Sequence, residues 1–402
     1  MTEVGEVGEV GEVSVDVLVI GAGQAGLGTG HWLTRRTSLS FVIIDGAEQL
    51  GQSWRRRWDS LMLFTPRRFS SLPGTAMPRG AGEYASKDET ADYLAAYAAR
   101  EHLPVRLQTR ILALTRQSCG FVAVTSTGLI RARHVVVATG PYTHAFVPDA
   151  ATGLDPTVCQ LHSADYRNPG DVTGQDVLVV GAGNSAAQLA VELAATRRVT
   201  VAAPAGMWFL PARILGVSVY WWLWLSGILN SRSASRISRL VRARGDGIIG
   251  RQLHTLVAAG TVRMLTERVV SARGRVVVLA DGAEVTVDAV LWCTGYRPDY
   301  GWLRVRGALD AQGVPVQDAG RSPVGGLHWV GLPWQTRLNS GIINGIGRDA
   351  RLAVTRIAAE HVQHVERRPR ATGASLAPGL DDQPPATPDG SATPASTAGE
   401  LA

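Results

Sequence analysis

Residues 15–26 read VDVLVIGAGQAG, and this stretch decides the fold of the chain. The aliphatic run from Val15 to Ile20 predicts a buried strand, and the glycines predict a tight turn into a helix over Ala25–Leu33. The next apolar run, Ser40–Asp45, predicts a second strand, so the segment forms one βαβ unit. Glycines in this pattern bring backbone amides close to a phosphate at the helix N-terminus, which is typical of a dinucleotide-binding turn.

Asp45 is an acidic residue at the position where a dinucleotide-binding βαβ unit has its ribose-binding acid. Asp45 ends the second predicted strand, 19 residues after Gly26, at the position of an acid that binds a ribose hydroxyl. A carboxylate there would repel a 2′-phosphate, so it favours FAD or NAD. The residues expected to bind this first dinucleotide are Gly21, Gly23, Gln24, Ala25, Gly26 and Asp45.

Residues 176–186 read DVLVVGAGNSA and repeat the pattern, with a predicted helix over Ser185–Ala195 and a strand over Arg198–Val201. This second strand ends in Ala202-Ala203-Pro204 without an acid, which favours NADPH over NADH, although NADH stays an alternative. Arg197, Arg198 and Arg213 are candidates for a 2′-phosphate. The residues expected to bind the nicotinamide dinucleotide are Gly181, Gly183, Asn184 and Ser185.

Continuous apolar strands that alternate with helices predict an α/β fold with parallel sheets. Two such units predict two Rossmann-like domains, the NAD(P)H domain being inserted into the FAD domain. The strands that end at Thr139-Gly140 and Thr294-Gly295 are the expected crossing points, and these four residues are expected beside the cofactors. The predicted boundaries are 1–13 for a flexible extension, 14–150 and 294–366 for the FAD domain, 151–293 for the NAD(P)H domain and 367–402 for a disordered tail.

Charge and composition exclude several other classes of protein. The net charge is +6, but the arginines are dispersed without a basic stripe, so we expect no nucleic-acid partner. The three cysteines form neither a CxxC dithiol nor a metal-type spacing with histidine, so we expect no disulfide reductase, no metal site and a reducing compartment. The N-terminus is acidic, unlike a signal peptide, and we predict a cytoplasmic protein.

The longest apolar run, Val217–Leu229, is shorter than the roughly 20 residues of a membrane span, so we expect no stable membrane insertion. Its tyrosine and three tryptophans leave three alternatives open. The run is a helix that touches a membrane surface, a lid over an apolar substrate tunnel, or ordinary core. Because a basic face is missing within the run itself, we favour the lid or the core.

Over about residues 14–360, the sequence resembles the flavin-containing (class B) monooxygenases, including plant auxin-forming members and shorter bacterial relatives. The order and spacing of the motifs make the resemblance specific. The motifs are GAGQAG with Asp45, Gly51-Gln52-Ser53-Trp54-Arg55, Trp58-Asp59-Ser60-Leu61, Thr65-Pro66, Ser71-Leu72-Pro73-Gly74, Ala138-Thr139-Gly140-Pro141, His162-Ser163-Ala164-Asp165-Tyr166, Thr294-Gly295-Tyr296-Arg297-Pro298-Asp299 and Gly331-Leu332-Pro333-Trp334.

The resemblance implies that NAD(P)H reduces FAD, that O₂ forms a C4a-hydroperoxide on the flavin, and that a small hydrophobic substrate is oxygenated. It further implies that Trp54 and Arg55 cover the flavin ring or its ribityl chain. His162 and Tyr166 match the second half of the family signature F-x-G-x-x-x-H-x-x-x-[FY] and are expected to be catalytic.

Two departures from the family pattern keep a second hypothesis open. Pro156, Thr157 and Val158 replace the F-x-G half of the signature. The loop that carries an asparagine near the flavin in many members offers Thr65 instead, which we take as a catalytic candidate. The alternative function is a flavin oxidoreductase that passes electrons from NAD(P)H to a quinone, a metal ion or O₂ without oxygenating a substrate.

Overall fold

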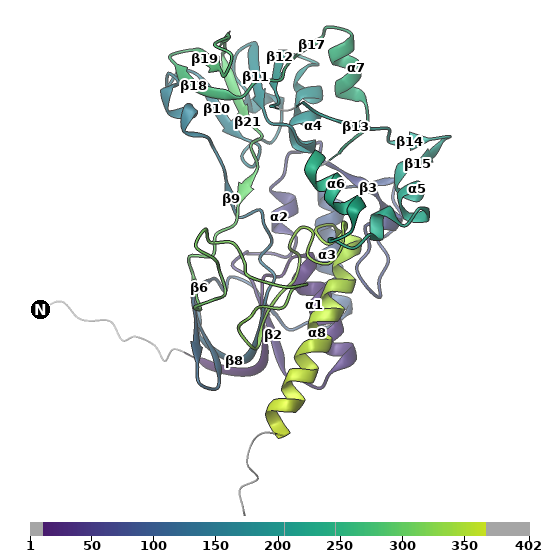
Figure 1. The fold of residues 1–402 in the computed structure, drawn as a ribbon, viewed down its shortest axis with the longest axis vertical. Helices are drawn as coiled ribbons and strands as arrows, with labels where there is room; N and C mark the ends of the chain where they lie inside the picture. The colour runs from purple at the N-terminus through teal and green to yellow at the C-terminus, as the bar shows by residue number, and fades with distance from the viewer. Residues whose placement is uncertain (1–10, 205, 246, 367–402) are drawn as a thin grey trace, which may run out of the picture. The chain divides into compact units, whose positions relative to one another are not determined.

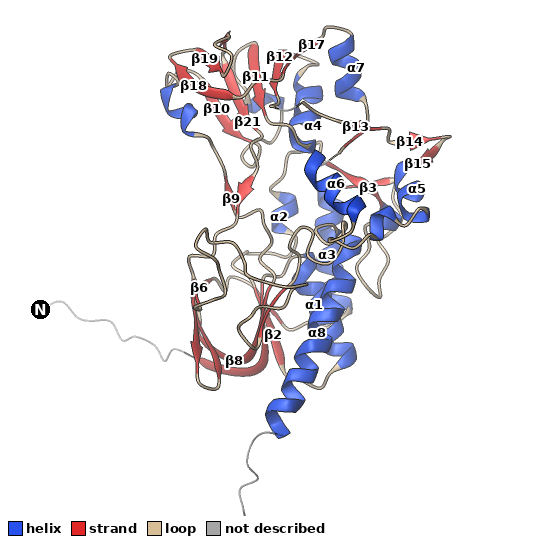
Figure 2. Cartoon of the chain, in the orientation of Figure 1, coloured by secondary structure: helices blue, strands red, loops and turns tan. Residues whose placement is uncertain are grey.

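The computed structural model describes residues 11–204, 206–245 and 247–366. The predicted disordered tail and most of the predicted N-terminal extension lie outside these residues. Within them, the main sheets are a mixed sheet and a parallel sheet, which Figure 1 shows by labels such as β6 and β8 for the first and β11 and β21 for the second. Figure 2 shows the helices that accompany these strands.

The mixed sheet carries the first glycine turn. Its strand order is β23-β6-β7-β8-β1-β2-β5, and β24 pairs in parallel with β8. Pairs on both sides of β1 are parallel, whereas β6, β7 and β8 form an antiparallel meander. The strands are β1 (Glu12–Ile20), β2 (Phe41–Ile44), β5 (Val105–Arg106), β6 (Ile111–Gln117), β7 (Gly120–Thr125), β8 (Gly128–Val137), β23 (Leu303–Arg304) and β24 (Leu327–Trp329).

The parallel sheet carries the second glycine turn, and its order is β10-β21-β11-β12-β17. Its strands are β10 (Cys159–His162), β11 (Asp176–Val180), β12 (Arg198–Ala202), β17 (Val262–Leu265) and β21 (Ala289–Trp292). All of these residues lie between β8 and β23, so the chain leaves the first sheet, forms the second and returns. This arrangement confirms the predicted α/β class with one Rossmann-like unit inserted into the other. The domain boundaries in residue numbers stay a proposal.

Smaller elements complete the description. An antiparallel sheet consists of β18 (Val269–Arg273), β19 (Val276–Leu279) and β20 (Glu284–Thr286), and paired strands are β3 (Met62–Pro66) with β4 (Tyr84–Ser86), β9 (His144–Ala145) with β22 (Tyr296–Arg297), β13 (Phe209–Leu210) with β16 (Ile248–Ile249) and β14 (Arg213–Ile214) with β15 (Val217–Ser218). The α-helices are α1 (Gln24–Arg36), α2 (Gln52–Arg55), α3 (Lys87–Arg100), α4 (Asn184–Leu193), α5 (Val219–Leu225), α6 (Arg236–Arg244), α7 (Gln252–Ala258) and α8 (Ile343–Glu366), and the 3₁₀ turns are η1 (Arg67–Phe69), η2 (Asp149–Gly153), η3 (Pro169–Asp171) and η4 (Ile228–Asn230).

Strand β1 starts earlier than the sequence indicated. It begins at Glu12, inside the segment predicted as an extension, because Glu12 and Val13 pair with Leu129 and Ile130 of β8. The stretch Ser86-Lys87-Asp88-Glu89 is typical of a capping box and predicts the start of a helix, and α3 begins there. The Ser86 hydroxyl accepts a hydrogen bond from the Glu89 N–H at 3.1 Å, and the Glu89 carboxylate accepts one from the Ser86 N–H at 2.8 Å.

Helices α1, α3 and α8 cover one face of the mixed sheet. Their buried side chains, such as Leu27, Leu94 and Ile346, pack with Val19 and Val136 of the sheet in one apolar cluster. The apolar positions Leu352, Ile357 and Ala358 predict a helix over Asp349–Val365 that packs on the FAD domain. It is present as the longer α8, whose buried residues join this cluster. Burial of such large aliphatic side chains contributes about 1.5–3 kcal/mol each.

The apolar run Val217–Leu229 is not one helix. Gly227, with φ of 73°, separates the short helix α5 from the turn η4. The buried part, Tyr220 and Leu229, packs on Phe69, whereas Trp224 stays half exposed. No helix in the described part of the chain is both long and apolar enough to cross a membrane. The segment therefore packs over Phe69, which is compatible with both the lid and the core hypotheses.

Candidate functional site

The first glycine turn forms a cradle at the carboxyl end of β1. Gly21 has φ of +107°, and a Cβ there would lie 2.5 Å from the Ala138 carbonyl oxygen, so only glycine fits. Gly23, by contrast, has an ordinary φ of −75° and no protein atom within 4 Å of the position of a Cβ. Gly23 caps helix α1, whose first turn has neither an acidic residue nor a side-chain cap. Open space at a free helix N-terminus is what a pyrophosphate requires, so the cradle fits the predicted dinucleotide.

Asp45 lies beside this cradle, as the spacing predicted. One carboxylate oxygen accepts a hydrogen bond from the Ala22 N–H at 2.7 Å, and the other accepts one from the Ala47 N–H at 2.8 Å. The side chain thus holds the end of β2 against the glycine turn. Gln24 and Ala25 form the start of α1, and the Ala25 side chain is buried against the core.

The second glycine turn has the same construction. Gly181, with φ of +149°, is packed against the Cys293 carbonyl at the end of β21, just as Gly21 is packed against Ala138. Gly183 caps α4 and again has no protein atom within 4 Å of a Cβ position. The Asn184 side chain accepts from the Ile249 N–H at 3.2 Å and donates to the Gly247 carbonyl at 3.3 Å, so it fixes the neighbouring chain. Ser185 follows it, half-buried, in the first turn of α4.

The predicted crossing points connect the sheets. Gly140 and Gly295 have φ of +72° and +83°, with nothing within 4 Å of a Cβ position. Thr139 is half-buried beside Gly140, and the Thr294 hydroxyl donates to the Phe146 carbonyl. The strands that follow, β9 and β22, pair with each other, so the outgoing and returning chain segments run side by side.

His162 lies at this connection, with both ring nitrogens in use. Its Nε2–H donates to the Gly295 carbonyl at 3.0 Å, and its Nδ1 accepts from the Ala164 N–H at 3.0 Å. Its ring packs edge-on against Tyr296, which in turn bonds Arg57. Burial lowers the pKa of His162, and the Arg57 charge contributes in the same direction. The geometry supports a neutral histidine that joins β10 to the returning chain.

The other catalytic candidates, Tyr166 and Thr65, are buried. The Tyr166 hydroxyl donates to a Glu192 carboxylate oxygen at 2.9 Å, and burial raises the pKa of Tyr166. The Thr65 hydroxyl bonds the hydroxyl of Ser70, the residue after Phe69, at 2.7 Å. The side chains of His162, Tyr166 and Thr65 do not bond one another. Their partners are Gly295 and Ala164 for His162, Glu192 for Tyr166 and Ser70 for Thr65.

Trp54 and Arg55 lie where the two domains meet. Trp54 packs against the apolar clusters of both main sheets. The Arg55 guanidinium pairs with Asp92 at 2.5 Å and lies 3.8 Å from Asp88, both of α3. The Arg55 guanidinium is therefore held by α3, whereas the Trp54 side chain faces the cores of both sheets.

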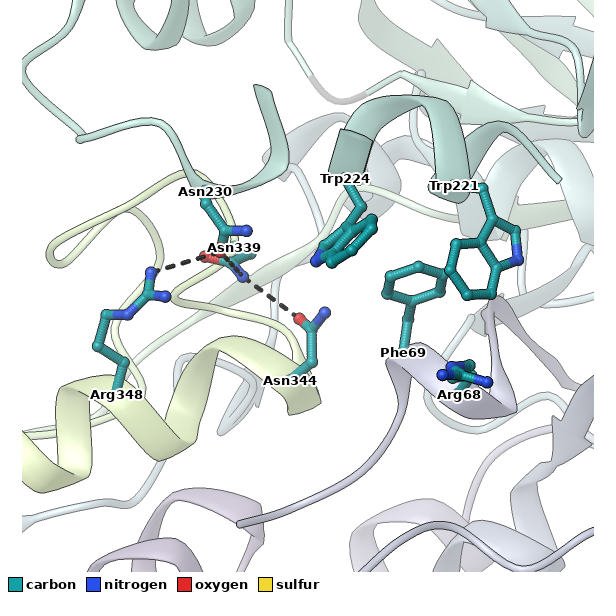
Figure 3. Close-up of a pocket in the computed structure, with 8 residues that line it drawn as sticks. All are labelled: Arg68, Phe69, Trp221, Trp224, Asn230, Asn339, Asn344 and Arg348. Atoms are coloured by element: carbon teal, nitrogen blue, oxygen red, sulfur yellow. Dashed lines mark hydrogen bonds between the residues drawn. The ribbon is translucent and has the colours of Figure 1, made fainter. Parts of the chain in front are cut away.

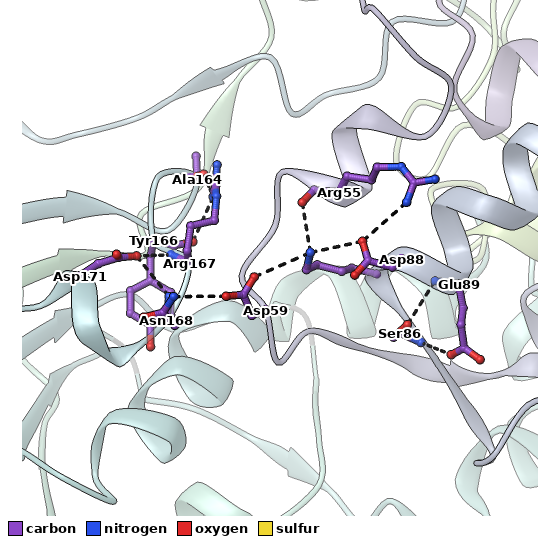
Figure 4. Close-up of polar contacts among 11 residues, drawn as sticks. Arg55, Asp59, Ser86, Asp88, Glu89, Ala164, Tyr166, Arg167, Asn168 and Asp171 are labelled. Carbon is purple, nitrogen blue, oxygen red and sulfur yellow. Dashed lines mark hydrogen bonds and ion pairs between the residues drawn. The ribbon is translucent and has the colours of Figure 1, made fainter.

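A polar network extends from Arg55 to the second domain (Figure 4). Lys87, which is the single lysine of the sequence and is buried, donates to the Arg55 carbonyl at 3.3 Å. Its ammonium also lies 3.8 Å from an Asp59 carboxylate oxygen. Asp59 accepts in turn from the Asn168 amide at 3.2 Å. These contacts hold the loop at Trp58-Asp59 between α3 and the loop that follows β10.

A pocket of about 330 Å³ lies beside Arg68 and Phe69, a few residues after Thr65 (Figure 3). Three separate segments line it, with aromatic side chains at one end and asparagines with Arg348 at the other. Phe69 packs edge-on against Trp221 with ring centroids 5.0 Å apart. Asn339 is buried and its amide donates to the Asn230 and Asn344 side chains, each at 3.4 Å. The lining residues are Arg68, Phe69, Trp221, Trp224, Asn230, Asn339, Asn344 and Arg348.

Comparison with known proteins decides the family. Residues 18–215 match the family described as pyridine nucleotide-disulphide oxidoreductase. An uncharacterized CzcO-like oxidoreductase of Geobacillus kaustophilus is 41% identical over 343 residues, 85% of this chain and 98% of that protein. A flavin-containing monooxygenase from Stenotrophomonas maltophilia superposes with a TM-score of 0.73 at 31% identity, over 86% of this chain and 99% of that one. The chain belongs to the flavin-containing monooxygenase family.

The family assignment confirms the resemblance and the oxidoreductase class. The indole-3-pyruvate monooxygenase YUCCA1 of Oryza sativa subsp. japonica is a more distant relative, 26% identical over 73% of this chain and 79% of that protein. Members of the flavin-containing monooxygenase family use FAD and NADPH, in agreement with the two fingerprints. Cys119, Cys159 and Cys293 are free thiols, of which Cys293 is buried.

The pocket residues of this flavin-containing monooxygenase were missed by sequence reasoning. Apart from the tryptophan-rich run, no motif distinguished them, because they come from segments far apart in the chain. Two of the three arginines named for a 2′-phosphate, Arg197 and Arg198, lie away from the second glycine turn. Arg198 pairs with Asp176 at the amino end of β12, opposite the glycine turn, Arg197 precedes it, and Arg213 pairs with Glu83 at 2.5 Å.

We expect the neutral His162 to make the stability of this monooxygenase depend on pH. Its folded-state pKa lies below the ordinary 6.5, so the unfolded chain binds the proton more readily. The free energy of unfolding should therefore fall as the pH drops below about 6.5. The variant His162→Gln can still donate a hydrogen bond to Gly295 but does not titrate. Measured by urea unfolding, its free energy of unfolding should fall less than that of the parent protein between about pH 7.5 and 5.5. Equal losses in both proteins would rule this out.

Proposed function

We propose that the protein is an NADPH-dependent FAD monooxygenase that acts on a small, largely apolar substrate with one polar group. The observation that carries this proposal is the pair of glycine cradles, each at the N-terminus of a helix and each with open space at its second glycine. Gly21, Gly23 and Asp45 would hold FAD, and Gly181, Gly183 and Ser185 would hold NADPH. The bound flavin supplies the chemistry by which NADPH and O₂ convert a substrate to its oxygenated form, NADP⁺ and water.

The chain's own residues bind and position the reactants. The backbone N–H groups of the first turns of α1 and α4 would donate hydrogen bonds to the two pyrophosphates. Trp54 packs between the cores of both domains. His162 is a positioning residue in this proposal, because it ties the end of β10 to Gly295 beside the second cradle. Phe69, Trp221 and the α5 segment would exclude water from the substrate.

The proposed substrate pocket has two kinds of lining. Phe69 and Trp221 form an aromatic wall, and Arg68 lies over the Trp221 ring at 5.2 Å from the centroid. Asn230, Asn339 and Arg348 lie at the other end, with Arg348 donating to Asn230 at 3.3 Å. An apolar ring or chain fits the first part, and a polar or anionic group fits the second.

The test uses the purified full-length protein. We expect a yellow protein that releases flavin on denaturation and oxidises NADPH in air. With a panel of amines, sulfides and ketones, a fitting substrate should give one product per NADPH consumed and little hydrogen peroxide. A colourless protein that binds no added FAD would overturn the proposal.

A second candidate is the non-oxygenating flavin oxidoreductase, and one observation favours it. The segment that replaces the F-x-G half of the signature has no phenylalanine or glycine to offer the second cradle. Its Val158 is buried in an apolar cluster with Leu154 and Val277. This candidate predicts that NADPH oxidation gives stoichiometric hydrogen peroxide, or reduced quinone or metal ion when these are added, across the whole substrate panel.

The pocket assignment gives a separate prediction. Trp221→Ala should raise the KM for the substrate about tenfold, which corresponds to the loss of about 1.4 kcal/mol of aromatic contact. Flavin content should stay unchanged, and more peroxide should form per NADPH because substrate no longer fills the pocket. The matched control is Trp222→Ala, since the neighbouring Trp222 points its Nε1–H at the Ile214 carbonyl and does not line the pocket. Equal KM changes in both variants would remove Trp221 from the site.

A further inference from the structure

A buried group of metal-ligating side chains lies away from both cradles. His134 on β8, His328 on β24 and Glu360 on α8 each offer one ligand atom, and these atoms all lie within 4.8 Å of one another. His328 is completely buried, and His134 is 6% exposed. The residues are distant in the sequence, so the cysteine and histidine spacing that predicted no metal site could not reveal them.

The fold brings these three side chains together on one face. In the parallel pairing of β24 with β8, His328 lies opposite Val136. Val136 is two residues after His134, and side chains two residues apart on a strand point to the same face. Both histidines therefore point to the same side of the sheet. Val136 belongs to the apolar cluster under α8, which identifies that side as the helix-covered face. Glu360 follows the buried Ile357 by three residues and therefore lies on the face of α8 that meets the sheet.

Three of the four imidazole nitrogens of this group have no hydrogen-bond partner. This holds for both ring nitrogens of His328 and for Nδ1 of His134. Nε2 of His328 lies 3.4 Å from a Glu360 oxygen, but without the geometry of a hydrogen bond. A buried polar atom without a partner costs about 1–3 kcal/mol, so several such atoms aimed at one point call for a ligand.

The distance between two of these ligand atoms suits a small divalent cation. Zinc binds imidazole nitrogen and carboxylate oxygen at about 2.0–2.2 Å, and two ligands at a tetrahedral angle then lie about 3.4 Å apart. The His328–Glu360 distance already has this value. The other Glu360 oxygen pairs with Arg321 at 3.1 Å, which leaves the oxygen near His328 available and orients it.

We propose that His134, His328 and Glu360 bind a divalent transition metal ion, with zinc as the preferred occupant. Two imidazoles and one carboxylate are a donor set typical of zinc and cobalt, and a water molecule would complete a four-coordinate site. The metal would bind α8 to β8 and β24. His134 lies three residues before the end of β8, about 10 Å from the carboxyl edge where the first cradle sits, so the site has a structural role separate from the proposed oxidation chemistry.

The experiment measures metal binding by the untagged full-length protein after removal of metals with a chelator. A Cys119→Ser background removes the exposed thiol, which binds zinc on its own account. Isothermal titration with Zn²⁺ should show one tight site per chain, and Zn²⁺ should raise the melting temperature. Added Co²⁺ should give the visible absorption of four-coordinate cobalt.

Variants of the three ligands distinguish this site from any other. His328→Gln and Glu360→Gln should each weaken Zn²⁺ binding at least about tenfold. The control His254→Gln changes an exposed histidine of α7 and should leave binding unchanged. Glu360 lies nearer the surface than His328, so Glu360→Gln still tests zinc binding if His328→Gln does not fold. Absence of zinc binding by the parent protein, or equal binding by Glu360→Gln, would overturn the proposal. Flavin content and NADPH oxidation report on the proposed function independently.

Discussion

Gly23→Val should yield a folded protein that no longer binds flavin. Gly23 has φ of −75°, which valine accepts, and nothing in the protein lies within 4 Å of the new Cβ. The valine methyls would instead occupy the space in front of the α1 N-terminus, where a pyrophosphate is proposed to sit. We expect FAD affinity to fall at least about a hundredfold, equivalent to about 2.7 kcal/mol. Loss of the glycine cap costs about 1 kcal/mol at most, so the circular dichroism spectrum should stay native.

The matched control is Gly183→Val in the second cradle. Gly183 has the same open surroundings and caps α4 in the same way. This variant should retain its yellow colour, whereas its KM for NADPH should rise at least about a hundredfold. Flavin release on denaturation and NADPH titration measure the two effects. If both variants lost flavin equally, or if neither did, the assignment of one cradle to each dinucleotide would be wrong.

Local sequence patterns were sufficient for the parts of the fold that depend on near neighbours. Gly21 has a backbone conformation that favours glycine, and the strand, turn and helix around it follow from residues within one βαβ unit. The Ser86–Glu89 capping box likewise identified the start of α3. These features were predictable because the physical cause and its consequence lie within a few tens of residues of each other.

The pocket and the metal-ligand group were not predictable, because tertiary pairing creates them. Asn230, Asn339 and Arg348 meet only when α5 and η4 pack over the start of α8. His134 and His328 become neighbours only through the parallel pairing of β24 with β8. The Val217–Leu229 run shows a local limit as well, since Gly227 ends the helix that the apolar residues alone would continue.

Gly26, the third glycine of the first fingerprint, is expected to be essential for the stability of the fold. A Cβ on Gly26 would overlap the carbonyl oxygen of Gly21, a backbone atom that the turn itself holds in place. Gly26→Ala should therefore destabilise the protein by about 3 kcal/mol or more, because overpacking cannot be relieved by a side-chain rotation. Any shift of Gly21 would also distort the cradle, so the variant should lose flavin together with stability.

The second fingerprint provides the comparison, because it has Ala186 at the corresponding position. That alanine is fully buried in α4, so the turn at Gly181 already accommodates a Cβ there. Ala186→Gly should cost only about 1 kcal/mol, from the lost methyl group and the lower helix propensity of glycine, and flavin content should not change. Urea unfolding of both variants, with flavin content measured alongside, tests the contrast. Similar losses of stability would mean that the close approach of α1 to its glycine turn is not what requires glycine at position 26.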